Sequence, residues 1–312
     1  MDQAASLRHK NRVSGFSYLK RNWDLYLLLV PVAAYFIIFK YIPMYGVQIA
    51  FKNFIASKGI WGSPWVGAEH FNRFFSSYYF KNIVTNTLGI SLYALIAGFP
   101  VPILLALMLN EVRHTRFKKA VQTVTYAPHF ISMVVMCSMI ILFLSPQAGF
   151  VNRILKALGF EGIYFMGEPA WFKTIYVFSG IWQNAGWSSI IYMAALAGID
   201  PQLHEAAIVD GAGRLRRIWH INIPGILPTA VILLILNSGQ LMSVGFEKVF
   251  LLQNDLNRST SDVISTFVYR VGLIQRDFSF STAVNLFNSV INMILLVLVN
   301  TISRRVGETS LW

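Results

Sequence analysis

Neutral amide and indole side chains interrupt three long apolar stretches, and their spacing is the first hint of chemistry in this sequence. Within an apolar stretch such groups are costly unless they face a protein interior or a water-filled cavity. Amides hydrogen-bond to hydroxyls and aromatic rings stack on ring faces, so the mixture suits a sugar. Hydrogen bonding between packed helices is the alternative for any one residue. The candidates are Trp182, Gln183, Asn184 and Trp187, then Asn237 and Gln240, and then Asn285, Asn288 and Asn292 at helical spacing.

A second pattern lies between two apolar stretches, in residues 200–224. Asp200 can cap a helix that has Pro201 at its first position, and Asp210-Gly211 supplies a turn that ends it. A second short helix is predicted from Ala212 to about His220. Pro224 then marks the point where the chain enters the next apolar stretch, which is interpreted below as a membrane span. This helical element is too small for catalysis, but it suits docking to a soluble partner.

Motifs for nucleotide binding and for metal catalysis are missing from the sequence. It has no G-x-x-x-x-G-K-[ST] loop, and Gly211-Ala-Gly213 lacks the third glycine of a dinucleotide fingerprint. There is no H-E-x-x-H pair, and the six histidines show no metal-ligand spacing. We therefore expect no enzyme activity, no metal site and no ATP binding by this chain.

The elements that hold these residues are predicted to be membrane-spanning helices. Of 312 residues, 55% are hydrophobic and only 13% are charged, which argues against a soluble domain. A spanning helix needs about 20 mostly apolar residues. One weaker candidate precedes five windows that lack Asp, Glu, Lys and Arg, which gives an all-α protein with six membrane helices. The segments are Leu25–Phe39, Asn82–Asn110, Ala120–Asn152, Thr174–Ile199, Ile218–Phe246 and Phe278–Ser303.

The net charge of +12 is explained by membrane topology. Just over half of the 26 basic residues lie in alternate short segments: the first 21 residues, the loops near Arg116 and Arg216, and the end at Arg304-Arg305. Under the positive-inside rule, both termini and these loops are cytoplasmic. Nucleic-acid binding is therefore not expected. The N-terminal apolar stretch has no small-residue cleavage site and is interpreted as an uncleaved anchor.

At this point the chain resembles a known family. Glu205-Ala206-Ala207, Asp210-Gly211-Ala212 and Ile221-x-Ile223-Pro224 match the EAA loop of type I ATP-binding-cassette (ABC) importer permeases, the binding-protein-dependent inner-membrane components with a MetI-like fold. The segments that begin at Lys20 and at Phe39 are similar to the polysaccharide or lipoprotein-operon subgroup, which is related to maltose permeases. The resemblance covers almost the whole chain.

The resemblance implies a multi-pass subunit in a bacterial inner membrane that imports an oligosaccharide or polysaccharide fragment. It implies a second permease, with a heterodimer favoured, an external solute-binding lipoprotein, surrounding lipid, and two copies of a cytoplasmic ATPase that binds ATP and Mg. Residues of the EAA loop would contact that ATPase. These are Glu205, Ala206, Ala207, Asp210, Gly211, Ala212, Arg214 and Pro224.

The expected domains follow from this interpretation, and three alternatives stay open. Residues 1–22 form a cytoplasmic tail, 23–81 the first span and an external loop, 82–303 the permease core with the EAA loop at 200–224, and 304–312 a second tail. A permease of the same family could carry glycerol phosphate or another small polar solute. A secondary carrier would need intramembrane acids, and a membrane enzyme would need a reactive cluster. The sequence supplies neither.

Overall fold

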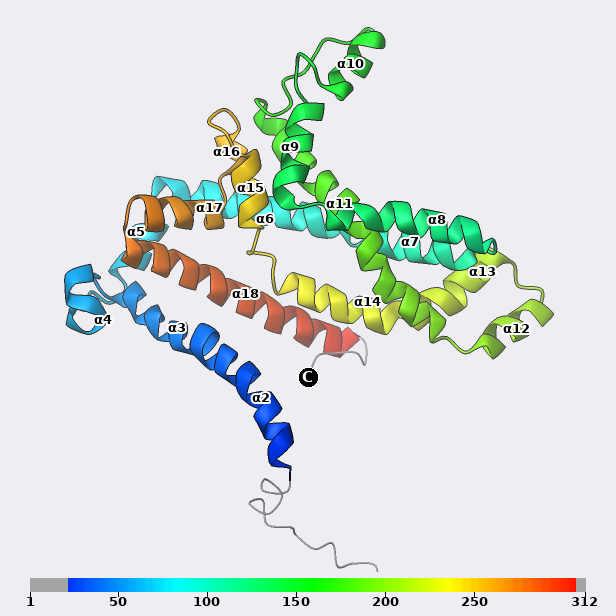
Figure 1. Cartoon of the computed structure of the whole chain (residues 1–312), viewed down its shortest axis with the longest axis horizontal. Helices are drawn as coiled ribbons and strands as arrows, with labels where there is room; N and C mark the ends of the chain where they lie inside the picture. Colours follow the sequence, from blue (N-terminus) through cyan, green and yellow to red (C-terminus); the bar gives the residue numbers. More distant parts are fainter. Residues whose placement is uncertain (1–21, 307–312) are drawn as a thin grey trace, which may run out of the picture.

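The computed structural model describes residues 22–306, and over this range the regular structure is helical. One isolated antiparallel bridge joins Lys52 to Trp65. The predicted all-α fold is confirmed. The predicted tails fall almost wholly on residues 1–21 and 307–312, outside the described residues. The helices run roughly lengthwise through the molecule, with α12 at one end and α4 and α5 at the other (Figure 1); we call these the α12 end and the α5 end.

The first span is a continuous helix over Trp23–Phe51. It consists of α2 (Trp23–Phe36), η1 (Ile37–Tyr41), α3 (Ile42–Met44) and η2 (Tyr45–Phe51). The α2 segment stands apart from the other helices, whereas η2 packs against the sixth span (Figure 1). The chain then forms η3 (Ala56–Lys58), α4 (Gly59–Gly62) and α5 (Glu69–Phe75).

The second span extends over Tyr78–Glu111 and the fourth over Pro169–Ala197. The second consists of α6 (Tyr78–Gly98) and α7 (Pro100–Glu111), and the fourth is α11 alone. Within residues 22–306, four helices are long and apolar enough to cross a membrane, and a bent pair makes five. The α11 helix is the remaining predicted span: at 29 residues it is long enough, but its polar side chains lower its hydropathy.

The third predicted span, Ala120–Asn152, is not one straight helix. α8 (Thr115–Tyr126) and η4 (Ala127–Phe130) are followed by α9 (Met133–Phe143) at an angle of 101°. Pro128 lies in η4, and extended backbone at Ser132 lets its hydroxyl cap α9 by accepting from the Val135 amide. The chain leaves the helix bundle here and continues to α10 (Phe150–Ala157), which projects from it (Figure 1).

The fifth span differs from the prediction at both ends. α13 (Arg214–Arg217), η5 (Ile218–Asn222) and α14 (Ile223–Ser238) form one unbroken helix of 25 residues, so Pro224 does not interrupt it. The helix ends at Ser238, short of the predicted Phe246, because Gly239 to Gly245 form a turn. α15 (Phe246–Leu252) follows this turn.

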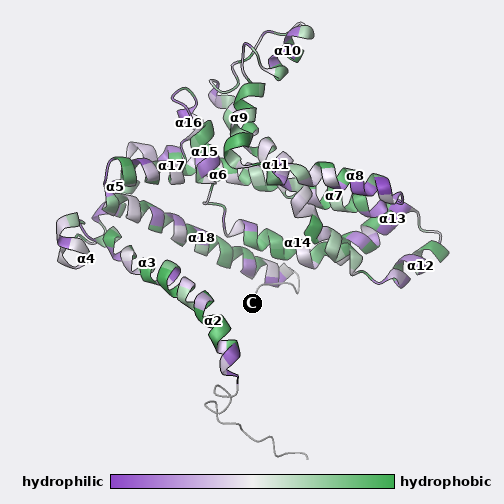
Figure 2. Ribbon diagram, viewed as in Figure 1, coloured by the Kyte–Doolittle hydropathy of each residue, from purple (hydrophilic) through white to green (hydrophobic). Residues whose placement is uncertain are grey.

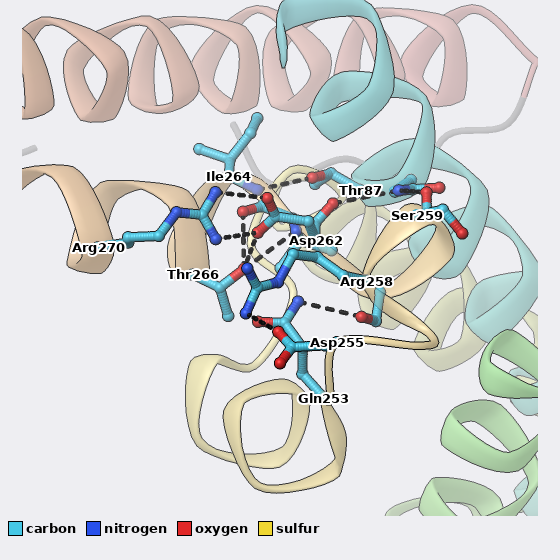
Figure 3. A network of polar contacts seen from close by, with 12 residues as sticks. Thr87, Gln253, Asp255, Arg258, Ser259, Asp262, Ile264, Thr266 and Arg270 are labelled. Carbon is cyan, nitrogen blue, oxygen red and sulfur yellow. Dashed lines mark hydrogen bonds and ion pairs between the residues drawn. The ribbon is translucent and has the colours of Figure 1, made fainter. Parts of the chain in front are cut away.

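The sixth span, α18 (Phe278–Val306), follows a folded segment at the α5 end. That segment contains α16 (Arg258–Ser261), α17 (Ile264–Tyr269) and η6 (Arg270–Ile274). Its centre is the buried carboxylate of Asp262, which lies 2.6 Å from a guanidinium nitrogen of Arg270 and accepts from Thr266 at 2.9 Å (Figure 3). The Ile264 amide donates to Thr87 of α6 at 3.0 Å, which fastens this segment to the second span.

Among the described residues, three apolar clusters hold the helices together. One joins α9, α11 and α15, a second joins α5, α6, α17 and α18, and a third joins α7, α11 and α14. Much other apolar surface stays exposed, notably along α2 and α9 (Figure 2). An exposed apolar surface of this extent suits a protein surrounded by lipid and by other subunits.

Candidate functional site

The helix pair at the α12 end begins at the residue that the sequence indicated. Asp200 accepts a hydrogen bond from the Gln202 amide at 2.9 Å, and Pro201 occupies the first turn of α12 (Pro201–Val209). Proline fits there because the first helical turn needs no amide donor. The predicted N-cap is therefore confirmed.

Gly211 ends α12 in a left-handed conformation, with φ of 74°. The Ala212 amide donates to the Ala207 carbonyl at 2.8 Å, and the Gly211 amide donates to the Ile208 carbonyl at 3.0 Å. This pair of bonds is a Schellman motif, in which glycine avoids the steric cost of positive φ. The predicted turn is confirmed, and the second helix begins at Arg214, two residues later than expected.

The surface of this helix pair is open and partly apolar. None of the residues of α12 is buried. Val209 is 88% exposed and Leu215 is 74% exposed. Of the eight residues predicted to contact a partner, Glu205, Ala206, Asp210, Gly211, Arg214 and Pro224 are exposed, and Ala207 and Ala212 are half-buried. Apolar side chains exposed at a polar end of the molecule favour a protein contact.

Two adjoining cavities of about 390 and 440 Å³ form a groove along α11. They share six lining residues from α6, α7, α11 and the turn after α14, namely Ala94, Gly98, Pro102, Tyr176, Ser188 and Gly245. Two glycines and an alanine leave room between the helices, and the non-helical turn closes one side. Irregular backbone within a membrane protein is tolerated where it is buried or lines such a cavity.

Four of the predicted pathway residues meet in this groove. Asn237 and Gln240 line the first cavity, and Gln183 and Asn184 line the second. Gln183 is only 5% exposed, and its amide donates to the Ile131 carbonyl at 3.0 Å. Asn184, Asn237 and Gln240 are exposed where they line the groove, and the Asn184 amide nitrogen donates to the Gly180 carbonyl at 3.1 Å.

The other predicted pathway residues do not line these two cavities. Asn292 of α18 accepts from the Met242 amide and donates to Ser243, both at 2.8 Å, so it fastens the turn after α14. The Asn288 side-chain oxygen is buried and has no partner among the described residues, and Asn285 is exposed.

The two predicted indoles lie beside the groove. Trp182 lines a separate apolar cavity next to α7 and α8. Trp187 stacks on His129, with ring centroids 4.7 Å apart and planes 4° apart. His129 in turn lies 3.1 Å from the Asn184 side-chain oxygen. This cluster joins η4 to α11, so these contacts serve helix packing.

Lys248 of α15 lines the second cavity and was not singled out from the sequence. It lies two residues after the end of the fifth apolar window, Ile218–Phe246, so it looked like an ordinary loop residue. Its ammonium donates to the Tyr176 carbonyl at 2.7 Å and lies 4.6 Å from the centroid of the Tyr176 ring. Burial lowers the pKa of Lys248 from 10.5 to about 8.

Comparison with known proteins assigns the chain to a family. Residues 98–308 match the family described as binding-protein-dependent transport system inner membrane component. The chain belongs to this family. It is thus a multi-pass membrane protein and a component of a transport system, as the resemblance predicted.

Individual relatives extend the match to almost the whole chain. Protein LplB of Bacillus subtilis is 43% identical over 96% of this chain and 94% of its own length. The polygalacturonan/rhamnogalacturonan transport system permease protein YteP of the same organism is 46% identical over 92% of this chain and 90% of its own. A chain in the crystal structure of a bacterial alginate ABC transporter, complexed with an alginate pentasaccharide-bound periplasmic protein, superposes with a TM-score of 0.88. It is 42% identical, and the match covers 95% of this chain and 99% of that one.

Proposed function

We propose that this chain is one of two permease subunits of an ABC importer that carries an acidic oligosaccharide across a bacterial inner membrane. The observation that carries the proposal is one unbroken helix, Arg214–Ser238, that connects the exposed helix pair to the groove. Its first turns follow the Schellman turn, and Asn237 near its last turn lines the first cavity.

This continuity supports a rigid-body mechanism. A cytoplasmic ATPase that binds the α12 surface would move α12 when ATP closes it, and the helix would transmit that displacement to the groove. Glu205 and Gly211 would seat the element in the ATPase. Two ATPase copies would serve this subunit and a second, different permease, and both termini would be cytoplasmic, as the distribution of basic residues favours.

The groove supports a sugar as the substrate. Asn184, Asn237 and Gln240 offer neutral amide donors and acceptors along it, and such groups pair with hydroxyls. The relatives support an acidic polysaccharide fragment, because one belongs to an alginate transporter and another is named as a polygalacturonan/rhamnogalacturonan permease. An external solute-binding lipoprotein would deliver it. The contacts of Gln183 and Asn292 support packing roles for these two residues.

Uptake measurements test this proposal. The assembled complex, purified through a tag on this chain and placed in proteoliposomes with its external protein, should import labelled oligogalacturonate or oligoalginate only with internal ATP. Glycerol 3-phosphate and neutral oligosaccharides serve as comparison solutes. ATP-dependent uptake of glycerol 3-phosphate alone would replace the sugar assignment, and uptake driven by a proton gradient without ATP would refute the importer mechanism.

A further inference from the structure

The neutral amides of the groove leave one buried cation beside it unexplained. Lys248 is 5% exposed and lines the second cavity together with Asn184 and Ser188. The ion pairs found among residues 22–306 join other residues, so no described carboxylate lies within ion-pair distance of this ammonium. A buried charge without an opposite charge is costly, and proteins seldom keep one without a role.

Packing accounts for only part of this arrangement. An ammonium has three donors, and the Tyr176 carbonyl takes one of them. Lys52 has the same surroundings in the loop before α4: its ammonium donates to the Ile60 carbonyl at 2.7 Å and lies 4.7 Å from the Trp65 ring. A carbonyl and an aromatic ring are thus enough to anchor a buried lysine in this fold. Lys248 differs because it lines the groove.

A missing side chain makes room for the ammonium of Lys248. A Cβ atom built on Gly180 of α11 would lie 3.2 Å from that nitrogen. Lys173, which lies on α11 as Gly180 does, also fits against a glycine. A Cβ atom on Gly89 of α6 would lie 3.0 Å from the Lys173 nitrogen. Lys173 precedes Gly180 by seven residues, about 10 Å along the helix. The two cations therefore follow one another along α11.

The groove also contains a carboxylate, whose repulsion of an anionic ligand must be compared with the attraction by Lys248. Glu247 lines the second cavity, but it is exposed and makes no ion pair with its neighbour Lys248. An exposed carboxylate is screened by water, whereas a buried ammonium acts in a lower dielectric. The cation therefore dominates recognition where a ligand displaces water from this wall.

We propose that Lys248 is a specificity-determining residue that binds a carboxylate of the sugar during its passage through the groove. This proposal rests on the proposed function and narrows it to oligosaccharides that contain uronic acids. The bond would be a charge-assisted hydrogen bond from the ammonium to the sugar carboxylate. Lys173 lines neither cavity, so the proposal concerns Lys248 alone.

The test compares two probes of equal length, trigalacturonate and its fully methyl-esterified form, in proteoliposomes that contain the assembled complex and saturating external protein. Lys248→Met keeps the length of the side chain and removes its charge. It should lower trigalacturonate uptake per complex roughly tenfold or more, because a hydrogen bond between charged groups is lost, and should change ester uptake less than about twofold. Lys248→Arg should retain most uptake of both probes.

A matched variant separates recognition from general charge effects. Lys58→Met removes an exposed positive charge outside the groove. It should leave the uptake of trigalacturonate unchanged. Unchanged trigalacturonate uptake in Lys248→Met, or an equal loss of both probes, would overturn the proposal while the importer function stands. A wild-type complex that imports neither probe but imports another solute with ATP would overturn the proposed substrate class itself.

Discussion

Substitutions at Gly211 test whether the end of α12 seats in a partner. A Cβ atom at this position meets no other described atom within 4 Å, and the neighbouring residues of α12 are exposed, so a side chain here extends away from the subunit. The φ of 74° costs a residue with a Cβ roughly 1–2 kcal/mol. The Schellman turn would thus be weakened by a factor of about 5–30 in Gly211→Ala and in Gly211→Trp alike. Gly211→Asn should be milder, because asparagine tolerates this conformation.

A lower uptake in Gly211→Trp than in Gly211→Ala would therefore indicate that a partner subunit packs closely against this residue. We expect Gly211→Asn to transport nearly normally and Gly211→Ala to lose up to a few-fold, while Gly211→Trp abolishes uptake in assembled complexes. Uptake and ATPase activity stimulated by the loaded external protein are both measured per complex. The same substitutions at Gly159 serve as a matched control for the backbone strain, since its φ of 85° is similar and its Cβ position is equally open. Equal activity of Gly211→Trp and Gly211→Ala would refute a close contact there.

Three further predictions concern topology, the groove and stability. In a cysteine-free background, a cysteine at Arg216 should react only with reagents on the cytoplasmic side and one at Asp255 only from outside; the opposite result would invert the proposed orientation. Asn237→Leu should lower uptake per complex without loss of thermal stability, whereas Asn292→Leu should lower the Tm, because it breaks two hydrogen bonds to the turn; a normal Tm for Asn292→Leu would contradict its fastening role. Asp262→Asn should cost roughly 3 kcal/mol by breaking a buried ion pair, measured by thermal denaturation, against less than about 1 kcal/mol for Asp255→Asn in an exposed pair; equal effects would argue against the buried network.

Local sequence signals predicted the helices and the cytoplasmic turn. The cap at Asp200 and the left-handed Gly211 depend on neighbouring residues only, so their chemistry is readable from the sequence. The six apolar segments were readable for the same reason, since hydrophobic length alone decides whether a helix can span a membrane.

Features that depend on contacts between distant segments were not readable. Hydropathy gave no sign of the 101° bend before α9, because no charged residue interrupts the predicted span Ala120–Asn152. The amides of Gln183 and Asn237 look alike in sequence, yet one is bonded to the Ile131 carbonyl and the other faces the groove. Lys248 looked like a loop residue because its burial comes from α11, about 70 residues earlier.

The loosely attached first span has a consequence for how such subunits are built and how they diverge. None of the residues of α2 is buried, in contrast to η2 at the other end of this span, which packs against α18. A helix that satisfies its backbone internally and shows apolar side chains all round can enter a bilayer without waiting for the rest of the chain. Trp23–Phe36 therefore serves as a separable module: its sequence can drift, or be exchanged for another anchor, without repacking the helices that enclose the groove.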